Sequence, residues 1–332
     1  MKRTNPILAL LAVLCLGLAF AACGGDDESS SSGGGSGSDS GGGDSAGTQI
    51  QKVDGADSKP AITVGSKNFT EQFILGEIYS QALEAAGFKV KKQLNLGSEL
   101  IAHKALQSGK IDAYPEYTGT ALTSFFGVKT NEVPRDADQA YEQTKEGFAK
   151  EDITALPHTP FENTFRLGMT KETNEKLGGI KTTSELKGKE KDLSISGFPE
   201  CKQRNDCLIG VEETYGLNFG KFVASEQKYQ VLDSGDADIA FVFTTDGDLA
   251  SGKYVTIDDD KKFFPPYNIT FAIRNEALKN IGPDGQKVIE EVQKPLTEKV
   301  MQELNARVDV DKQKPEAVAK AFLQSAGFTP KS

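Results

Sequence analysis

The sequence predicts an α/β protein whose folded part consists of two similarly built lobes around a shared cleft. Residues 60–332 are long for a single hydrophobic core. Short apolar segments alternate with amphipathic helical ones, which is typical of parallel strands joined by helices. A weak repeat, Leu-x-Ser-Gly-x-x-Asp, occurs at residues 106–112 and 232–238, and an aromatic residue followed by threonine stands five residues beyond each aspartate.

The first expected elements are a strand and a helix. The apolar run at residues 61–65 ends in glycine, which predicts a short buried strand followed by a turn. Residues 68–70 offer candidates for a helix N-cap, and Gly87 marks the end of that helix. Its apolar residues recur at helical spacing: Phe73, Ile74, Ile78, Ala82 and Ala85.

The next elements continue this alternation. We expect a strand within residues 88–96, a helix over residues 98–107 that ends near Gly109, and a short strand at residues 111–114. This order predicts a parallel sheet, because parallel strands need helical crossovers. Such sheets bind ligands at the carboxyl ends of their strands.

The internal repeat has two readings. Ser-Gly-x-x-Asp is a common turn between a helix and a strand, since glycine suits the end of a helix, and Asp112 and Asp238 would then serve the turn. The matched aromatic residues, Tyr117 and Phe243, favour two lobes that present equivalent loops to one cleft.

The C-terminal stretch is expected to complete the first lobe. Residues 284–328 read as helices interrupted at Pro295 and Pro315, because proline removes a helical hydrogen bond. We expect these helices to pack back against the first lobe.

The N-terminal residues are expected to direct export of the chain and not to belong to its folded part. Residues 1–22 combine a charged start with a short apolar run, which is typical of a signal peptide. The Ala-Ala-Cys ending at Cys23 resembles a bacterial lipobox, in which the cysteine is lipidated; the alternative is an ordinary signal peptide with an incidental cysteine. Residues 23–59, which begin with a Gly/Ser/Asp-rich tract, are expected to form a disordered tether. We therefore expect an extracytoplasmic protein that is lipid-anchored to the cell membrane.

Charge and motifs exclude several classes of function. The formal net charge is −10 and the sequence pI is near 5.0, which argues against a nucleic-acid partner and against electrostatic binding to an anionic membrane. Outside the Gly/Ser/Asp-rich tract, the sequence contains no Gly-x-Ser-x-Gly nucleophile elbow, and it has no P-loop or His-Glu-x-x-His motif, which argues against catalysis and against a cofactor. His103 and His158 have no spacing suited to a metal ion. Glu116 and Asp246 are expected to be exposed charges without an assigned role.

Two cysteines remain outside the targeting segment. Cys201 and Cys207 are separated by five residues in a chain that is expected to be exported, where oxidation is possible. We expect them to form a local disulfide, and two free thiols are the alternative.

Four strings of residues carry a resemblance to a known family. They are Gly-Ser-Lys-Asn-Phe-Thr-Glu-Gln at 65–72, Asp-Ala-Tyr-Pro-Glu-Tyr-Thr-Gly-Thr at 112–120, Thr-Thr-Asp-Gly at 244–247 and Phe-Pro-Pro-Tyr at 264–267. In these strings the chain resembles the substrate-binding proteins of ABC importers for glycine betaine, choline and carnitine. The resemblance runs from about residue 62 to residue 327.

This resemblance implies a two-lobed periplasmic-binding-protein fold of type II, with a ligand cleft between the lobes. Residues 60–162 and 268–330 would form lobe 1, and residues 163–267 would form lobe 2. The chain would not be an enzyme; it would pass a quaternary ammonium compound to ABC permease and ATPase subunits for osmoprotectant uptake. The alternatives are a receptor of the same fold for another cationic or zwitterionic metabolite, such as ergothioneine, and a ligand sensor.

The resemblance also implies a set of ligand-binding residues. The aromatic cage of the family corresponds here to Tyr117, Phe165, Phe243 and Tyr267. The residues that hold a ligand carboxylate correspond to Lys67, Thr120 and, where the sequence departs from the family pattern, Arg204. Asn163 opens an Asn-Thr-Phe string where many members have Asn-Thr-Tyr, and Gln72 would either reach the cleft from the first helical turn or act as a cap.

Elementary chemistry supports an aromatic cage for such a ligand. A quaternary ammonium has no N–H group, so hydrogen bonds cannot recognise its cationic head. Several aromatic faces can, each contributing roughly 0.5–2 kcal/mol when desolvated. The chain has no tryptophan, so a cage must use tyrosine and phenylalanine. Phenylalanine offers the ring face without the hydroxyl, so these residues do not specify which cationic ligand binds.

Overall fold

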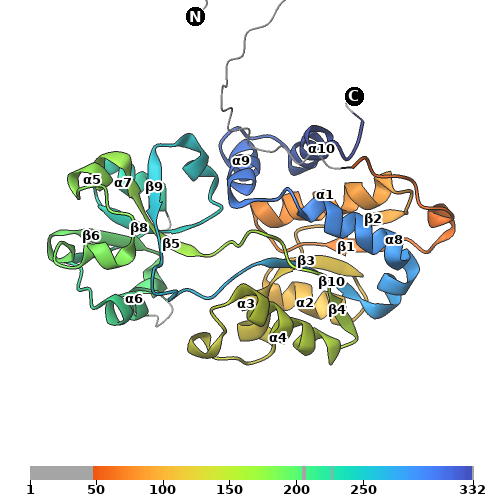
Figure 1. The fold of residues 1–332 in the computed structure, drawn as a ribbon, viewed down its shortest axis with the longest axis horizontal. Coiled ribbons are helices and arrows are strands. Elements are labelled where there is room, and N and C mark those ends of the chain that lie inside the picture. Colours follow the sequence, from red (N-terminus) through yellow and green to blue (C-terminus); the bar gives the residue numbers. More distant parts are fainter. Residues whose placement is uncertain (1–47, 204–206, 226, 331–332) are drawn as a thin grey trace, which may run out of the picture. The chain divides into compact units, whose positions relative to one another are not determined.

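The computed structural model describes residues 48–203, 207–225 and 227–330, which fold around two five-stranded sheets (Figure 1). Lobe 1 surrounds the sheet with strand order β2-β1-β3-β10-β4, and lobe 2 surrounds the sheet with order β7-β6-β8-β5-β9. The strands of lobe 1 are β1 Ile62–Gly65, β2 Val90–Gln93, β3 Ala113–Tyr117, β4 Ile153–Ala155 and β10 Ile269–Arg274. The strands of lobe 2 are β5 Phe165–Thr170, β6 Ser194–Gly197, β7 Lys221–Ala224, β8 Ile239–Phe243 and β9 Tyr254–Ile257. The predicted two-lobed α/β fold is confirmed.

The two sheets share one pattern of strand directions. In lobe 1, β1 pairs in parallel with β2 and β3, while β10 runs antiparallel to β3 and β4. In lobe 2, β6 pairs in parallel with β7 and β8, while β5 runs antiparallel to β8 and β9. The expectation of a parallel sheet was therefore only partly right. Strands β10 and β5 each follow directly on a crossing from the other lobe, so they enter their sheets without the helical crossover that parallel pairing needs.

Helices cover the sheets on both faces. The helices that follow lobe 1 strands are α1 Thr70–Ala85, α2 Glu99–Gln107, α3 Thr118–Thr120, α4 Ala137–Ala149 and α8 Asn275–Gln293. Lobe 2 contains α5 Lys171–Lys176, α6 Leu208–Tyr215 and α7 Lys228–Ser234. The chain closes with α9 Glu298–Asp309 and α10 Pro315–Ser325. Along β10, Ile269, Phe271 and Ile273 join the core under α1 and α8, whereas Ala272 joins the core under α2 and α4, as the alternation of side chains along a strand requires.

Helix α1 forms where the apolar spacing predicts it, but it begins without a side-chain cap. Its N-cap residue is Phe69, which makes no capping hydrogen bond. The helix ends at Ala85, and Gly87 follows with a φ of 96°. That left-handed conformation favours glycine, so Gly87 terminates the helix for the reason the sequence suggested.

The internal repeat forms the same turn in both lobes. The Asp112 carboxylate accepts a hydrogen bond from the backbone N–H of Thr63 in β1 at 2.7 Å. The Asp238 carboxylate accepts one from the backbone N–H of Ser194 in β6 at 2.8 Å. Strands β3 and β8 follow these aspartates and end at Tyr117 and Phe243. The repeat therefore places an aromatic residue at the carboxyl end of an equivalent strand in each lobe.

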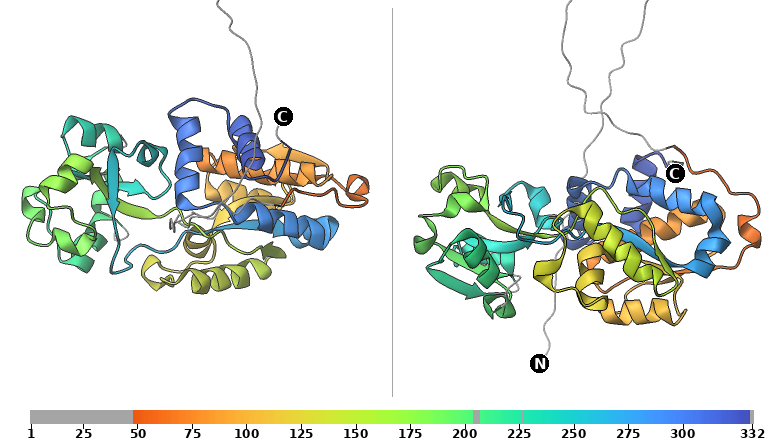
Figure 2. Two further views of the ribbon diagram at one scale, coloured as in Figure 1. Left: turned by 45° about the horizontal axis from the view of Figure 1, so that its top comes forward. Right: turned by 60° about the horizontal axis from the view of Figure 1, so that its bottom comes forward.

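The chain crosses between the sheets twice, after β4 and after β9 (Figures 1 and 2). The two crossing segments pair with each other, since Glu162 and Asn268 form an antiparallel bridge. The Thr164 hydroxyl donates a hydrogen bond to the backbone oxygen of Pro265 at 3.0 Å. The segments that join the lobes are therefore tied side by side.

The C-terminal helices differ in part from the expectation. Helix α10 packs on α1 in lobe 1, and Pro315 is its first residue rather than an interruption, because proline fits the first turn of a helix. Helix α9 packs on both α1 and the short 3-10 helix Gly247–Ser251 of lobe 2. The Gln302 side chain donates a hydrogen bond to the backbone oxygen of Thr244 at 2.7 Å. Helix α9 therefore contacts both lobes.

Two smaller expectations can be compared with the structure. Cys201 and Cys207 form the predicted disulfide, with their Cα atoms 5.2 Å apart and both residues buried. No helix in the described ranges combines the length and the apolar character that crossing a bilayer requires.

Replacing Gly247 with alanine is expected to destabilise the protein. A β-carbon at this position would lie 2.6 Å from the backbone nitrogen of Ala306 and 2.7 Å from its α-carbon. Backbone cannot move aside as a side-chain tip can, so we expect a loss of about 1–3 kcal/mol in the free energy of unfolding. Denaturant unfolding measures this loss of stability. The control is Ala250→Ser, because Ala250 is exposed in the same short helix. We expect the control to change the free energy of unfolding by less than about 0.5 kcal/mol. Equal stability of the two variants would contradict the contact.

Candidate ligand-binding site

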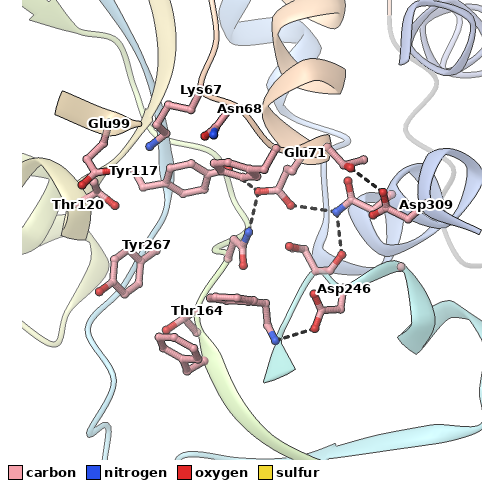
Figure 3. Close-up of a pocket in the computed structure, with 18 of the residues that line it drawn as sticks. Lys67, Asn68, Glu71, Glu99, Tyr117, Thr120, Thr164, Asp246, Tyr267 and Asp309 are labelled. Atoms are coloured by element: carbon pink, nitrogen blue, oxygen red, sulfur yellow. Dashed lines mark hydrogen bonds between the residues drawn. The ribbon is translucent and has the colours of Figure 1, made fainter. Parts of the chain in front are cut away.

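A cavity of about 710 Å³ lies at the carboxyl ends of β3 and β8, with walls from both lobes (Figure 3). Its lining includes the following residues that the sequence analysis proposed: Lys67, Tyr117, Thr120, Asn163, Phe165, Phe243 and Tyr267. Phe69, just before α1, also lines it, with its ring centroid 6.0 Å from that of Tyr117. The structure thus brings the four proposed cage residues to one cavity.

The lobe 2 wall contains two stacked phenylalanine rings. Phe165 opens β5 and Phe243 ends β8, and the two residues stand opposite each other in the antiparallel pair. Their ring centroids are 4.5 Å apart and their planes differ by 28°. Residues directly opposite on one sheet face pack in this way. Phe243 remains 37% exposed, so its ring is available to a molecule in the cavity.

The lobe 1 wall contains Tyr117 and Tyr267. Tyr117 ends β3, and Tyr267 lies in the second crossing segment. A β-carbon on Gly119 would lie 2.8 Å from both the Tyr267 ring and the backbone oxygen of Pro266. The glycine of the Tyr-Thr-Gly-Thr string is therefore needed for the Tyr267 ring to lie against α3.

Lys67 forms a buried ion pair with Glu116. Glu116 also accepts hydrogen bonds from the Tyr114 hydroxyl at 2.7 Å and from the backbone N–H of Tyr117 at 2.6 Å. The Lys67 ammonium lies 4.4 Å from the centroid of the Tyr117 ring. The expectation that Glu116 is an exposed charge without a role was wrong: it is fully buried and holds Lys67 in place. Glu116 is the second-last residue of β3, a strand in which every residue is buried, and this position explains its burial.

Lys228 has an equivalent place in lobe 2. Its ammonium lies 4.5 Å from the centroid of the Phe243 ring and 2.6 Å from a carboxylate oxygen of Asp246. Asp246 also accepts hydrogen bonds from the Tyr229 hydroxyl at 2.8 Å and from the backbone N–H of Phe243 at 2.9 Å. Asp246, also expected to be exposed and without a role, is partly buried and orders the end of β8.

Glu71 lies in the first turn of α1 and lines the cavity. It is 3% exposed and accepts hydrogen bonds from the Tyr117 hydroxyl, the Asn163 amide and the Asn305 amide (Figure 3). Burial raises the pKa of Glu71, while these hydrogen bonds and one from Thr245 act to lower it. Burial and the Glu71 charge raise the pKa of Tyr117 well above its ordinary value, so the Tyr117 hydroxyl stays protonated and donates to Glu71.

The charges around the cavity favour a cation. Among the described residues that line it, the basic side chains are Lys67 and Lys228, and each has an acidic partner. The acidic side chains of that lining are Glu71, Glu99, Asp246 and Asp309. Acidic groups therefore outnumber basic ones in this part of the chain, and the surplus attracts positive charge.

Two of the proposed residues do not appear in the cavity lining. Gln72 is fully buried behind it. Its amide oxygen accepts a hydrogen bond from the backbone N–H of Lys67 at 3.1 Å, and its amide nitrogen donates to the backbone oxygen of Pro115 at 2.9 Å. Gln72 therefore braces the loop that carries Lys67. Arg204 lies outside the described residues, as does Cys23.

Several lining residues were not proposed from the sequence. Glu71 lies in the first turn of α1, a position where acidic residues are common for reasons unrelated to a ligand. Lys228 follows no motif, and Asn305 and Asp309 lie in a C-terminal helix assigned to lobe 1 packing. The Thr-Glu-Gln string next to Lys67 was the signal that could have indicated Glu71.

Comparisons with known proteins agree with this geometry. The family model described as the substrate-binding domain of ABC-type glycine betaine transport systems matches residues 60–325. A glycine-betaine-binding protein of Pseudomonas aeruginosa is 32% identical over 283 residues, covering 81% of this chain and 89% of that protein. A carnitine transport binding protein of Listeria monocytogenes is 29% identical, covering 82% of this chain and 89% of that protein.

A third relative is longer than this chain. The ergothioneine transport permease/ergothioneine binding protein of Helicobacter pylori strain G27 is 31% identical over 276 residues. The alignment covers 82% of this chain but only 48% of that relative, so the chain spans about half of its length.

Solved structures show the same fold. One described as a glycine betaine/carnitine/choline ABC transporter superposes with a TM-score of 0.74 at 29% identity, covering 80% of this chain and 98% of that one. The apo form of the Escherichia coli protein YehZ superposes with a TM-score of 0.72 at 26% identity, covering 81% of this chain and 99% of that one. The chain therefore belongs to the family of substrate-binding domains of ABC-type glycine betaine transport systems, whose members are solute-binding proteins rather than enzymes.

Proposed function

We propose that this protein captures a quaternary ammonium compound in an aromatic cage between its lobes and delivers it to an ABC permease for osmoprotectant uptake. The observation that carries the proposal is the convergence of Tyr117, Phe165, Phe243 and Tyr267 on one cavity with a surplus of acidic groups. Aromatic faces and negative charge are what a cation without N–H groups can use. The glycine-betaine-binding and carnitine-binding relatives support the same class of ligand.

The contacts of a ligand carboxylate are a further part of the proposal. Lys67 and Thr120 line the cavity on the lobe 1 side, where they would face a carboxylate whose ammonium head lies in the cage. Because Lys67 is already paired with Glu116, a ligand carboxylate would share its ammonium group. Asn163 also lines the cavity. The contact of Arg204 with the ligand carboxylate stays a prediction.

Ergothioneine is a second candidate ligand. It is a trimethylated betaine with a larger, ring-bearing side chain, and the Helicobacter relative is named as an ergothioneine binding protein. By the resemblance, Phe165 stands where many members have tyrosine and Phe243 stands where tyrosine is usual, so this wall offers ring faces without hydroxyl groups. A cavity of about 710 Å³ is within the range of sites for ligands of drug-like size.

Delivery to a permease requires capture outside the cytoplasm. We infer a signal peptide at residues 1–22, lipidation of Cys23 and a tether after it, all from sequence. The tether is shorter than expected, because Ile50 and Val53 donate backbone hydrogen bonds to Phe328 and Ala86, and Ala56 is buried in the core of lobe 1. One lipid chain alone binds membranes only weakly, so stable anchoring takes more than one chain. The closed, ligand-bound form would then be presented to the permease and ATPase subunits.

Ligand binding is expected to raise the melting temperature of the purified domain. A ligand that binds the native state at a concentration of 100 times its Kd adds about 2.7 kcal/mol of stability. A thermal-shift screen should compare choline, glycine betaine, carnitine and ergothioneine with leucine and arginine as controls, followed by calorimetry of the hits. Stabilisation by the amino acids alone would contradict the proposal.

The ring of Phe243 is expected to contribute to affinity through its face. Phe243→Leu keeps an apolar side chain but removes the aromatic face, so binding should weaken about tenfold, whereas Phe243→Tyr should bind within about threefold of the wild type. Because the side chain is 37% exposed, neither change should disturb the fold. Calorimetric titration of the wild type and both variants with choline, and with its uncharged isostere 3,3-dimethylbutanol, measures these affinities. The cage would be refuted if both variants bound alike and the isostere bound as tightly as choline.

Cys23 is expected to hold the protein at the membrane. In cells that express the full chain, Cys23→Ser should move the protein from the membrane fraction to the soluble fraction, because the acyl chains are lost. Cys15→Ser is the matched control within the same segment and should leave the distribution unchanged. Membrane retention of Cys23→Ser would show that something other than this cysteine anchors the protein.

A further inference from the structure

One carboxylate ties together parts of the cavity that lie far apart in the sequence. Glu71 accepts hydrogen bonds at one oxygen from the Tyr117 hydroxyl, at 2.7 Å, and from the Asn163 amide, at 3.1 Å. Its other oxygen accepts a hydrogen bond from the Asn305 amide at 3.2 Å. Figure 3 shows Glu71 among the labelled lining residues with these bonds.

These hydrogen bonds lead to three of the four cage rings. Tyr117 carries one ring itself, and Asn163 stands two residues before Phe165. The Asn305 amide nitrogen also donates to the backbone oxygen of Thr245 at 2.8 Å, and Thr245 stands two residues after Phe243. Through these bonds, Glu71 connects ring-bearing segments of both lobes.

The donors around Glu71 are uncharged hydroxyl and amide groups. Other titratable groups face it from each side. Tyr79 on its own helix has a pKa raised by burial and by the Glu71 charge, and so does Tyr117 on β3; both stay neutral. The other charged groups in the described lining of the same cavity are Lys67, Lys228, Glu99, Asp246 and Asp309. A negative charge held by neutral donors beside aromatic faces suits a cationic ligand.

We propose that Glu71 is the positioning residue of this site, and that its ionised carboxylate holds the segments of Tyr117, Phe165 and Phe243 in the arrangement that binds a quaternary ammonium. The inference rests on the proposed function. The ionised carboxylate accepts all of these hydrogen bonds as charge-assisted bonds, whereas protonation weakens its oxygens as acceptors and adds an O–H donor among groups that already donate to it. The Asn305 amide cannot adapt by turning over, since its oxygen would then face the Thr245 carbonyl oxygen.

The affinity of the wild-type protein should therefore depend on pH. Choline is the suitable probe, because its ammonium charge does not change with pH. Burial raises the pKa of Glu71 above its ordinary value of 4.5, and binding needs the ionised form, so protons compete with choline. Affinity should be constant above that pKa, should fall below it, and should level off about tenfold lower once Glu71 is protonated. Calorimetry measures this down to the pH at which near-UV circular dichroism shows loss of the native fold.

A matched pair of variants separates positioning from a general effect on the helix. Glu71→Gln should weaken choline binding about tenfold at neutral pH, because an amide accepts at only one of the two positions and cannot serve the Tyr117 and Asn305 donors together. Its affinity should no longer change over the acidic range. Glu77→Gln lies on the same helix and is also buried, but that carboxylate pairs with Lys92 and does not appear in the cavity lining. It should bind choline as the wild type does and keep the loss of affinity in acid.

The possible outcomes distinguish this inference from the proposed function. A wild-type affinity that is constant down to the onset of unfolding, or a Glu71→Gln variant that binds choline with wild-type affinity, overturns the role of Glu71 alone. A wild-type protein that binds none of choline, glycine betaine, carnitine and ergothioneine overturns the proposed function, and this inference with it. If Glu71→Gln does not fold, the wild-type pH profile decides.

Discussion

The buried ion pair between Lys67 and Glu116 is the interaction on which the cavity depends. Both side chains are buried, Glu116 completely and Lys67 to all but 4%, and removing one partner of such a pair costs about 3–5 kcal/mol. Lys67 follows β1 and Glu116 is the second-last residue of β3, so the pair joins the carboxyl ends of two neighbouring strands. The same carboxylate accepts the backbone N–H of Tyr117. The start of α1 and the ring of Tyr117 are thereby fixed relative to each other before any ligand arrives.

The two lobes form their walls of the cavity with the same kinds of contact. Each uses an aspartate of the repeat to bind the backbone of the neighbouring parallel strand, and each ends the next strand in an aromatic residue. Each also places a lysine ammonium over that ring, Lys67 at 4.4 Å and Lys228 at 4.5 Å. A ligand cation must therefore approach the ring faces that these lysines leave open, or displace an ammonium from its acidic partner.

Much of the fold could be predicted because its determinants are local. The glycine after α1, the repeat and the disulfide each depend on a few neighbouring residues, and the cage residues were reached through strings that resemble a family. The antiparallel direction of β5 and β10 could not be predicted, since it follows from the chain crossing between lobes. Glu71, Glu116 and Asn305 were missed or misread because their roles arise from partners up to 234 residues away. Periodicity and spacing contain no information about such pairs.

Helix α9 has a mechanical consequence for a molecule of this kind. Two paired crossing segments alone would allow lobe 2 to swing in many directions, but Gly247 lies directly against the backbone of Ala306, and Gln302 and Asn305 bond the adjoining turn. These contacts act as a third point of attachment that is remote in sequence from the other two. Any rotation of lobe 2 relative to lobe 1 would have to break these contacts or slide them along α9. A helix from the C-terminal region, in addition to the crossing segments, would then constrain how the lobes move relative to each other.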